Sequence, residues 1–301
     1  MNVKSPITHS SNVILERKIP ASFIKEEYMS SYSIDVSGIL QNTDEVGVYR
    51  CLDTDFRFYG PSTAAGDAKF YEELQKFPWY YMDWKWEHEC VKGLLKKGES
   101  VLEIGCAEGT FIERIQKENI SGVGLELNVA AAESAQNKGL NVLTQSIEDH
   151  AKEKPNHYDV VCSFQVMEHI ADVQSVLTAS VRALKKGGRL MISVPNNSSF
   201  IKYSPNSIMN MPPHHMCLWD EKSLSNLQSQ FEITLTDFHY EPLQKYHFPV
   251  IWSNWLYKKL PSKFMAKAVN RISRYLGLYK LVGLRKNKII GHSIIAVYTK
   301  N

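Results

Sequence analysis

The sequence of 301 residues has few of the features that mark secreted, membrane-spanning or disulfide-linked proteins. No segment approaches the roughly 20 apolar residues that a membrane-spanning helix needs. The first 30 residues carry seven charged side chains and no apolar stretch, which is unlike a signal peptide. The five cysteines are an odd number without a CxxC pair, so neither a disulfide framework nor a complete zinc site is expected. These absences favour a cytoplasmic protein.

Acidic residues are missing from residues 245–290, a segment that contains eleven lysines and arginines. The net charge of +3 hides this asymmetry, because the other 24 basic residues share the chain with all 32 acidic ones. Within 261–280 the basic residues recur at helical spacing opposite an apolar stripe. The two sets are Lys263, Lys267, Arg271 and Arg274, and Met265, Ala268, Val269, Ile272 and Leu276. With Trp252, Trp255 and Tyr257 just before it, this pattern is typical of a helix on a membrane surface.

Two other interpretations of this segment stay open. The helix could pack on the protein and recruit a polyanionic acceptor, such as a phosphorylated or lipid-linked glycan, or it could dock with its basic face in solvent. Nucleic acid is not expected as a partner, because the rest of the chain is acidic and no RNA-binding module is recognisable. The sequence thus predicts peripheral contact with an anionic membrane at its inner face, or with a polyanionic acceptor, through 245–290.

The spacing of apolar residues predicts the fold class. Short apolar strands are expected at 100–105, 121–127, 139–145, 158–164, 188–195, 231–238 and 292–299. Segments of helical period at 111–119, 129–139 and 173–188 separate the first five. This alternation predicts an α/β fold with a doubly wound, mostly parallel seven-stranded sheet.

The remaining segments predict the domain organisation. We expect an N-terminal extension at 1–66, a main domain at 67–301 and a basic helical insertion at 243–290, before the last strand. Residues 69–96 are expected to be helical, with an interruption at Pro78. YRCLDTDFRFYGP (49–61) predicts a hairpin that resembles half of a zinc ribbon. Thr54 stands in place of the second cysteine, so no zinc is expected there.

VLEIGCAEGTF (101–111) predicts a ligand-binding turn after the first of these strands. In an open parallel sheet, ligands bind beyond the carboxyl ends of the strands. Gly105 and Gly109 let the backbone turn sharply, and Ala107, the smallest replacement for a middle glycine, is tolerable there if its φ stays negative. Glu126 ends the next strand, where a carboxylate can accept two hydrogen bonds from a ribose diol.

These segments together resemble a class I S-adenosylmethionine-dependent methyltransferase over residues 95–200. The matching segments are VLEIGCAEGTF, GVGLELN, SIED (146–149), YDVVCSFQVMEHI (158–170) and LKKGGRLMISVPN (184–196). The loop of that family reads E-x-G-x-G-x-G and tolerates alanine in the middle. Its leading acid, here Glu103, is absent from dinucleotide loops. The resemblance implies a Rossmann-like fold and S-adenosylmethionine as the cofactor.

The resemblance also implies the cofactor-binding residues. Those expected along the methionine and ribose are Glu103, Gly105, Cys106, Ala107, Gly109 and Glu126. Those expected around the adenine are Leu127, Ser146, Ile147 and Glu148. Phe164 and Gln165 are expected beneath the sulfonium. Glu103 and Glu126 are the strongest indications of a ligand, because an acid at a buried strand end lowers the stability of the fold unless it has a partner.

Two segments offer a general base, which a hydroxyl acceptor needs in order to lose its proton. The first is MEHI, with Glu168 and His169. It resembles the quinone O-methyltransferases, in which an E-x-x-E-H segment holds a divalent metal. Gln165 replaces the first acid here, so no metal is expected. A structural role for Glu168 and His169 is the alternative.

The second segment is MPPHHMCLWD (211–220), with His214 and His215. Similar PPHH-W segments occur in bacterial methyltransferase-like proteins. Adjacent side chains of an extended segment point in opposite directions. We therefore expect one histidine to face the acceptor and the other to hold the loop, without deciding which. A pair of loop histidines near a buried tryptophan is the alternative.

The aromatic stretch WYYMDWKWEHE (79–89) is expected to cover the cofactor. Its rings could contact the sulfonium through cation–π interactions, or they could belong to the core. They are Trp79, Tyr80, Tyr81, Trp84 and Trp86. Lys85 is expected to reach the methionine carboxylate.

The sequence therefore predicts an S-adenosylmethionine-dependent O-methyltransferase with His169, His214 and His215 as catalytic candidates. Its acceptor would be a small molecule, a glycan or a lipid-linked molecule. A quinone-like ring is a second candidate acceptor. A catalytically inactive protein that binds the cofactor and acts as a partner subunit is the third interpretation.

Overall fold

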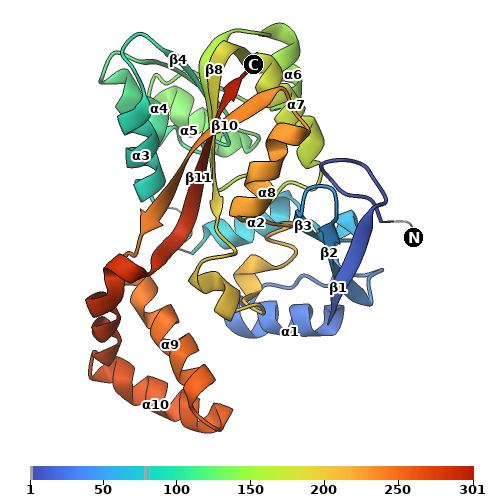
Figure 1. Ribbon diagram of the computed structural model, residues 1–301, viewed down its shortest axis with the longest axis vertical. Coiled ribbons are helices and arrows are strands. Elements are labelled where there is room, and N and C mark those ends of the chain that lie inside the picture. Colours follow the sequence, from blue (N-terminus) through green and yellow to red (C-terminus); the bar gives the residue numbers. More distant parts are fainter. Residues whose placement is uncertain (1–2, 78–79, 81) are drawn as a thin grey trace.

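The computed structural model describes residues 3–77, 80 and 82–301, which form two sheets (Figure 1). The larger sheet has the strand order β10-β11-β8-β7-β4-β5-β6. Five neighbouring strands, β8, β7, β4, β5 and β6, are parallel, and β11 runs antiparallel between β8 and β10. The strands are β4 (Ser100–Ile104), β5 (Ser121–Leu125), β6 (Val142–Leu143), β7 (Tyr158–Phe164), β8 (Leu184–Pro195), β10 (Ile233–Pro242) and β11 (Ile290–Lys300). The predicted mostly parallel, seven-stranded sheet is confirmed.

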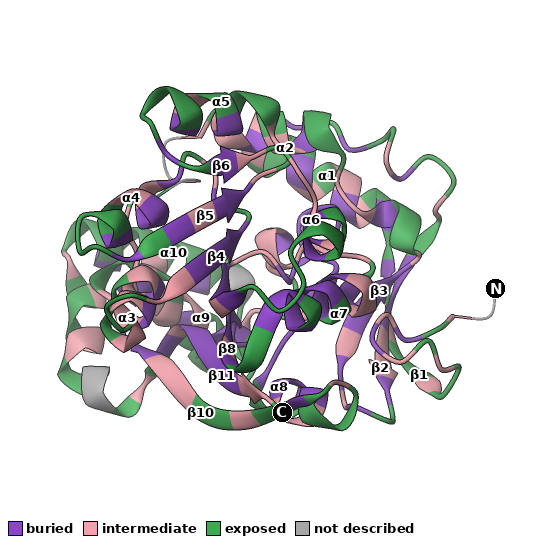
Figure 2. Cartoon of the chain, turned by 90° about the horizontal axis from the view of Figure 1, so that it is seen from above, coloured by how far each residue is buried: buried purple, intermediate pink, exposed green. Residues whose placement is uncertain are grey.

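Helices cover both faces of this sheet because its strands alternate between two buried sides. On one side, Val101 and Val160 pack with α3 (Trp86–Leu94) and α4 (Thr110–Gln116). On the other side, Leu102 and Val161 pack with α6 (Ile147–Glu153), α7 (Val173–Ala183) and α8 (Glu221–Ser225). Helix α5 (Val129–Asn137) covers β6 at the sheet edge. Figure 2 shows the buried strands between these layers.

The expected helix over 173–188 ends earlier than predicted, at Ala183, and residues 184–188 begin β8. The backbone is already extended at Leu184, with φ −72° and ψ +140°, and the left-handed Gly187 follows at φ +73°. Helix α2 (Ala68–Gln75) precedes α3, and Pro78, the expected interruption between them, lies outside the described residues.

The N-terminal residues form a second, antiparallel sheet in the order β1-β2-β3-β9. Its strands are β1 (Val13–Pro20), β2 (Glu45–Cys51), β3 (Arg57–Gly60) and β9 (Cys217–Leu218), with α1 (Ala21–Tyr32) and the short helix η1 (Ser62–Ala64) beside it. The expected hairpin is therefore present as β2 and β3. Phe56 packs on Trp219 with ring centroids 4.4 Å apart, and both rings are fully buried. One continuous core joins this sheet to the larger one.

The segment between β10 and β11 extends away from the sheet as a pair of helices, at the bottom of Figure 1. It comprises η5 (Lys245–His247), α9 (Phe248–Lys259), α10 (Lys263–Tyr275) and η6 (Leu278–Lys288). The remaining short helices are η2 (Phe200–Tyr203), η3 (Ile208–Asn210) and η4 (Asn226–Ser229). The predicted helical insertion before the last strand is confirmed. Among the described residues, no helix has the length and apolar content needed to cross a bilayer.

Candidate functional site

The turn after β4 follows a left-handed path at three residues. The φ angles are +71° at Gly105, +47° at Ala107 and +75° at Gly109. Ala107 therefore does not meet the condition of a negative φ that the sequence analysis set for an alanine here. The turn keeps this conformation because the backbone N–H of Ala107 donates a hydrogen bond of 2.9 Å to Oε2 of Glu126. A Cβ atom at Gly105 would lie 2.6 Å from Cγ2 of Val166, so this position has no room for a side chain.

Glu126 lies where β4 and β5 end side by side. Besides the bond from Ala107, its Oε1 accepts a hydrogen bond of 2.8 Å from the backbone N–H of Asn128. Two backbone donors therefore fix the orientation of the carboxylate. Each oxygen keeps a second lone pair, so the partly exposed carboxylate can accept two more hydrogen bonds from a pair of ligand hydroxyls.

Glu103 lies within β4 and is 4% exposed. Among the described residues its Oε2 has no hydrogen-bond partner. Burial, with the nearby charge of Glu126, raises the pKa of Glu103 to about 8. A buried carboxylate without a partner is costly, and a cationic ligand group would remove that cost.

Several other predicted cofactor residues serve mainly to shape the turn and its neighbours. The side chain of Cys106 packs under β5 beside Gly124, where a Cβ atom would lie 2.4 Å from its Sγ. Ser146 caps α6 by accepting a hydrogen bond from Asp149 N, and Ile147 is buried in the core. The carboxylate of Glu148 accepts a hydrogen bond from Ser175.

The remaining three predicted cofactor residues differ in exposure. Leu127 is 71% exposed just after β5 and is free to cover a flat ligand. The ring of Phe164 points into the core and packs on Phe111 at 4.9 Å. Nε2 of Gln165 lies 3.3 Å from Oγ of Ser193 and 3.4 Å from Oγ of Ser293, which holds it on the sheet.

The structure brings the three catalytic candidates together. The carbonyl oxygen of Glu168 accepts hydrogen bonds from the backbone N–H groups of Met216 and Cys217, at 2.7 and 3.0 Å. This joins the end of β7 to the PPHH segment. The ring of His169 consequently lies 4.6 Å from that of His214 and 4.9 Å from that of His215, centroid to centroid. We call these three residues the histidine cluster.

His214 and His215 do not point in opposite directions, so that prediction is wrong. Their rings stack at 4.5 Å with an angle of 21° between the planes. The cause is a tight turn, in which both backbone N–H groups donate to the carbonyl oxygen of Met211 at 3.1 Å. Burial lowers the pKa of His169 to about 4 and that of His214 to about 3, and it also lowers the pKa of His215. All three imidazoles are therefore neutral at pH 7.

Comparison with known proteins identifies the family to which this chain belongs. The family described as "Methyltransferase domain" matches residues 80–236, just over half of the chain. The chain belongs to the S-adenosylmethionine-dependent methyltransferases. A ubiquinone biosynthesis O-methyltransferase of Vibrio atlanticus is 30% identical over 173 residues, 52% of this chain and 72% of that protein. The protein of the same name from Klebsiella pneumoniae subsp. pneumoniae is 32% identical over 107 residues, 34% of this chain and 44% of its own length.

Solved structures with a similar fold include a SAM-dependent methyltransferase from Archaeoglobus fulgidus. It is 19% identical, covers 71% of this chain and 94% of its own, and superposes with a TM-score of 0.47. A structure titled as a SAM-dependent methyltransferase from Thermotoga maritima shares 19% identity and the same TM-score, covering 71% of this chain and 88% of its own.

The strand ends of this methyltransferase fit S-adenosylmethionine. The carboxylate of Glu126 has the acceptor capacity for the ribose diol, and the unpartnered Oε2 of Glu103 suits the cationic methionine part. Gly105 keeps the turn in its left-handed path, because Val166 occupies the space that a side chain there would need. These residues would hold the cofactor, which supplies an electrophilic methyl group when bound.

The aromatic stretch before β4 divides between two environments. The ring of Trp84 lies under the guanidinium of Arg114, 3.9 Å from its centroid, and Trp84 and Trp86 pack against the core under α3. The hydroxyl of Tyr80 instead lies 3.2 Å from Nε2 of His214. Trp79 and Tyr81 lie outside the described residues. Burial raises the pKa of Glu168 to about 8 and lowers that of His169, and the nearby charge of Lys85 has a smaller lowering effect on both.

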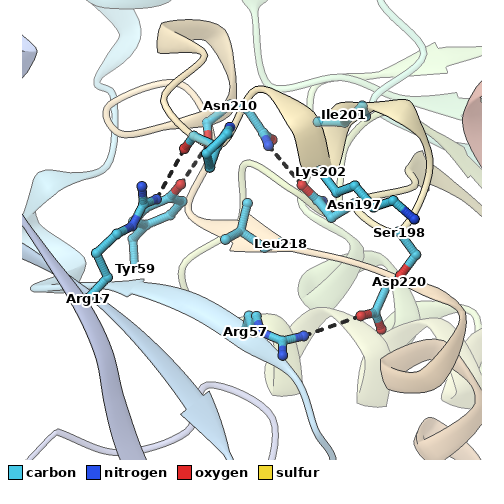
Figure 3. A pocket seen from close by; sticks show the side chains of 11 residues that line it. Arg17, Arg57, Tyr59, Asn197, Ser198, Ile201, Lys202, Asn210, Leu218 and Asp220 are labelled. Atoms are coloured by element: carbon cyan, nitrogen blue, oxygen red, sulfur yellow. Dashed lines mark hydrogen bonds and ion pairs between the residues drawn. The ribbon is translucent and has the colours of Figure 1, made fainter. Parts of the chain in front are cut away.

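A cavity of about 330 Å³ (Figure 3) is lined by Asn210, a neighbour of the histidine cluster, and not by the three histidines themselves. It lies between the smaller sheet and the loop after β8, and Arg17, Arg57 and Lys202 contribute positive charge to its wall. Asn210 connects the wall to the cluster, because its Oδ1 accepts a hydrogen bond of 2.9 Å from Nδ1 of His215. The sequence did not point to these residues, since Arg17 and Asn210 are nearly 200 positions apart and belong to no motif.

Proposed function

We propose that this methyltransferase O-methylates a hydroxyl group of a small molecule or a glycan. The observation that supports the proposal is the histidine cluster, which offers neutral imidazoles beside the strand ends that fit the cofactor. A neutral imidazole can accept the proton that a hydroxyl loses when its oxygen attacks a methyl group. Methyl transfer otherwise requires little beyond alignment of the reacting atoms.

In the proposed reaction, a histidine of the cluster takes up the proton that the acceptor hydroxyl loses. Nε2 of His169, His214 or His215 accepts the hydroxyl proton as the acceptor oxygen forms its bond to the methyl carbon. S-adenosylmethionine would supply the methyl group and would leave as the thioether S-adenosylhomocysteine, which retains the electron pair of the broken C–S bond. The turn around Gly105 and the carboxylate of Glu126 hold the donor in place, so the histidines act on the acceptor alone.

The cavity in Figure 3 supports an acceptor that carries an anionic group. Arg57 Nη1 lies 3.4 Å from Asp220, whereas Lys202 contributes its charge without an acidic partner within 4.0 Å among the described residues. A phosphate or carboxylate on a glycan or lipid-linked molecule would suit this wall. The name of the relatives, ubiquinone biosynthesis O-methyltransferase, supports a quinone-like ring as the alternative acceptor.

Product formation from a panel of hydroxylated acceptors tests the proposal. S-adenosylhomocysteine release would be measured for the wild type, for His214→Gln and His215→Gln, and for His157→Gln on the exposed surface. Loss of a general base lowers the rate about 10²- to 10⁴-fold. We expect that loss in at least one cluster variant and none in His157→Gln. Tight binding of S-adenosylhomocysteine without turnover on any acceptor would favour the inactive partner subunit instead.

We further propose that the helical insertion docks this enzyme on an anionic membrane. Helix α10 packs on α9 through small and polar residues, with Ala266 fully buried and Ser273 2% exposed. Trp252 Nε1 donates a hydrogen bond of 2.7 Å to Ser273. The apolar stripe identified in the sequence faces solvent, since Met265, Val269, Ile272 and Leu276 are all at least 38% exposed. Phe264 and Tyr275 are 82% and 91% exposed.

An anionic bilayer suits this surface in both charge and polarity. Residues 245–290 contain no acid that would repel lipid headgroups, and each Lys or Arg near such a surface contributes about 1 kcal/mol. Exposed aromatic and aliphatic side chains beside these charges can enter the boundary between headgroups and acyl chains. The insertion would then hold the acceptor cavity close to lipid-linked substrates.

Vesicle flotation tests the membrane proposal. The wild type should float with vesicles that contain phosphatidylglycerol at low salt, and less at high salt because the charges are screened. Phe264→Ser with Tyr275→Ser should abolish flotation, whereas Met29→Ser with Leu52→Ser, which removes exposed apolar side chains elsewhere, should not. An unbound wild type would refute the proposal. So would a dimer that only the first double variant dissociates, since a second copy would then cover the surface.

A further inference from the structure

We propose that the histidine cluster binds a divalent transition-metal ion. His169, His214 and His215 each place one ring nitrogen within 4.8 Å of the others. An ion that bonds to histidine nitrogen at about 2.0–2.1 Å would draw these atoms closer together. Among the described residues, no other group of three histidine, cysteine or acidic side chains comes as close.

The hydrogen bonds of the cluster leave Nε2 of each ring unprotonated, and Nε2 of His214 accepts a hydrogen bond of 3.2 Å from the hydroxyl of Tyr80. Nδ1 of His169 donates to the carbonyl oxygen of His214 at 2.6 Å, and Nδ1 of His214 donates to that of Met209 at 2.9 Å. Nδ1 of His215 donates to Oδ1 of Asn210 at 2.9 Å. Every Nδ1 therefore carries the proton, and every Nε2 is an unprotonated donor atom for a metal. Metal-binding histidines are typically oriented by such a bond from the opposite nitrogen to an oxygen.

This ligand set differs from the acidic set that the sequence suggested for the MEHI segment. Gln165, in the position of the missing acid, lies against Ser193 and Ser293 instead of the cluster. Two of the proposed ligands come from the PPHH segment, 45 or more positions farther along the chain than His169. The expectation of no metal rested on 165–169, on the scattered cysteines and on the 49–61 hairpin. The hydrogen bonds from Met216 and Cys217 to the carbonyl oxygen of Glu168 bring a different set of ligands together.

The chemistry of the donors selects the kind of ion. Three neutral imidazoles suit Zn²⁺, Co²⁺, Ni²⁺ or Cu²⁺, whereas Mg²⁺ and Ca²⁺ prefer oxygen ligands. The side chain of His169 is 21% exposed, which gives an ion a way in from solvent. The hydroxyl of Tyr80, now 3.2 Å from Nε2 of His214, would move aside or remain as a weak fourth ligand.

Three protein ligands leave a fourth tetrahedral position for an oxygen of the acceptor. This consequence, unlike ion binding itself, rests on the proposed O-methylation. An Nε2 bonded to the ion cannot also accept a proton. In the loaded protein the ion would lower the pKa of the hydroxyl oxygen, as it does for bound water, and the proton would pass to solvent.

Titration of chelator-treated protein with Co²⁺ tests the proposal independently of activity. We expect one ion per chain and the visible absorption of a tetrahedral nitrogen-ligated cobalt site. His169→Gln and His215→Gln should each weaken binding at least 10-fold, and Asn210→Ala, which releases His215, should weaken it about 10- to 100-fold. His157→Gln, on the exposed surface, should bind like the wild type.

Two further measurements keep the outcome unambiguous. Retained binding of S-adenosylhomocysteine shows that a variant is folded, and X-ray absorption of zinc-loaded wild type should report nitrogen ligands at about 2.0–2.1 Å. A wild type that gives no cobalt spectrum, or whose cobalt site survives both histidine variants, overturns the proposal. Methyl transfer that persists in chelator-treated protein would refute only the catalytic consequence. Absence of turnover with an intact cobalt site would count against the O-methylation proposal alone.

Discussion

The backbone N–H of Ala107 donates a hydrogen bond to the carboxylate of Glu126 and thereby ties the turn after β4 to the end of β5. The same carboxylate accepts a second backbone hydrogen bond from Asn128. One side chain therefore both shapes the loop and presents the oxygens that suit a ribose diol. Loss of this carboxylate should affect cofactor binding twice, through the lost contact and through the altered loop.

Glu126→Ala should weaken the binding of S-adenosylhomocysteine. Hydrogen bonds to a charged group contribute about 1.5–3 kcal/mol, which corresponds to a loss of affinity of about 10- to 100-fold. Isothermal titration calorimetry would measure it, with Glu133→Ala on the exposed face of α5 as the matched control. Equal affinities for the two variants would show that the ribose binds elsewhere.

The left-handed conformation of Ala107 predicts that Ala107→Gly stabilises the protein. An L-residue at positive φ costs about 1–2 kcal/mol, and glycine gives back about 0.5–1 kcal/mol through its greater freedom when unfolded. The free energy of unfolding should therefore rise by up to about 1.5 kcal/mol, with cofactor affinity kept. Ala130→Gly, in exposed helix α5, should instead destabilise by about 1 kcal/mol. Urea unfolding of both variants decides the question, and a destabilised Ala107→Gly would contradict the conformation seen here.

Glu103 predicts a pH dependence of the stability of the cofactor-free protein. Its pKa is about 8 in the folded state against 4.5 ordinarily, so the folded protein retains a proton that the unfolded chain releases. Stability therefore falls as pH rises from about 4.5 to 8, where the unfolded state binds fewer protons than the folded one. Glu103→Gln should remove this part of the slope and raise the melting temperature more at pH 8 than at pH 5. Glu133→Gln should change neither, and identical profiles for wild type and Glu103→Gln would refute the prediction.

The parts of the fold that could be predicted are those whose strands and helices show a regular spacing of apolar residues along the chain. Alternating strands and helices between residues 100 and 195 follow from apolar spacing, and the turn around Gly105 follows from its glycines. The cofactor candidates could be named for the same reason, because they directly follow these strands. Leu127, the first residue after Glu126, is an example.

The histidine cluster could be predicted only in part. His214 and His215 were recognisable as a pair, but their contact with His169 depends on hydrogen bonds from Met216 and Cys217 to a residue about 50 positions earlier. Strand β9 has two residues and therefore shows no period from which this pairing could be inferred. Which side of helix α10 packs against the protein could not be predicted from its periodicity alone. Small residues such as Ala266 allow close packing on α9, and this left the apolar stripe in solvent.

The packing of Phe56 on Trp219 predicts that the N-terminal sheet and the methyltransferase sheet unfold together. Both rings are fully buried in one continuous core, and Trp219 directly follows β9 and lies four positions after His215. Phe56→Ala should therefore lower the free energy of unfolding by about 3–5 kcal/mol, as expected for loss of a buried aromatic ring.

Denaturant unfolding followed by both circular dichroism and tryptophan fluorescence would measure this change. The two probes should give one coincident transition, because a shared core couples the sheets. Phe264→Ala, which removes a ring that is 82% exposed on α10, should change stability by less than about 0.5 kcal/mol. Two separate transitions, with only the first shifted by Phe56→Ala, would mean that residues 1–66 fold as an independent unit. In that case the histidine cluster would not depend on the N-terminal sheet for its position.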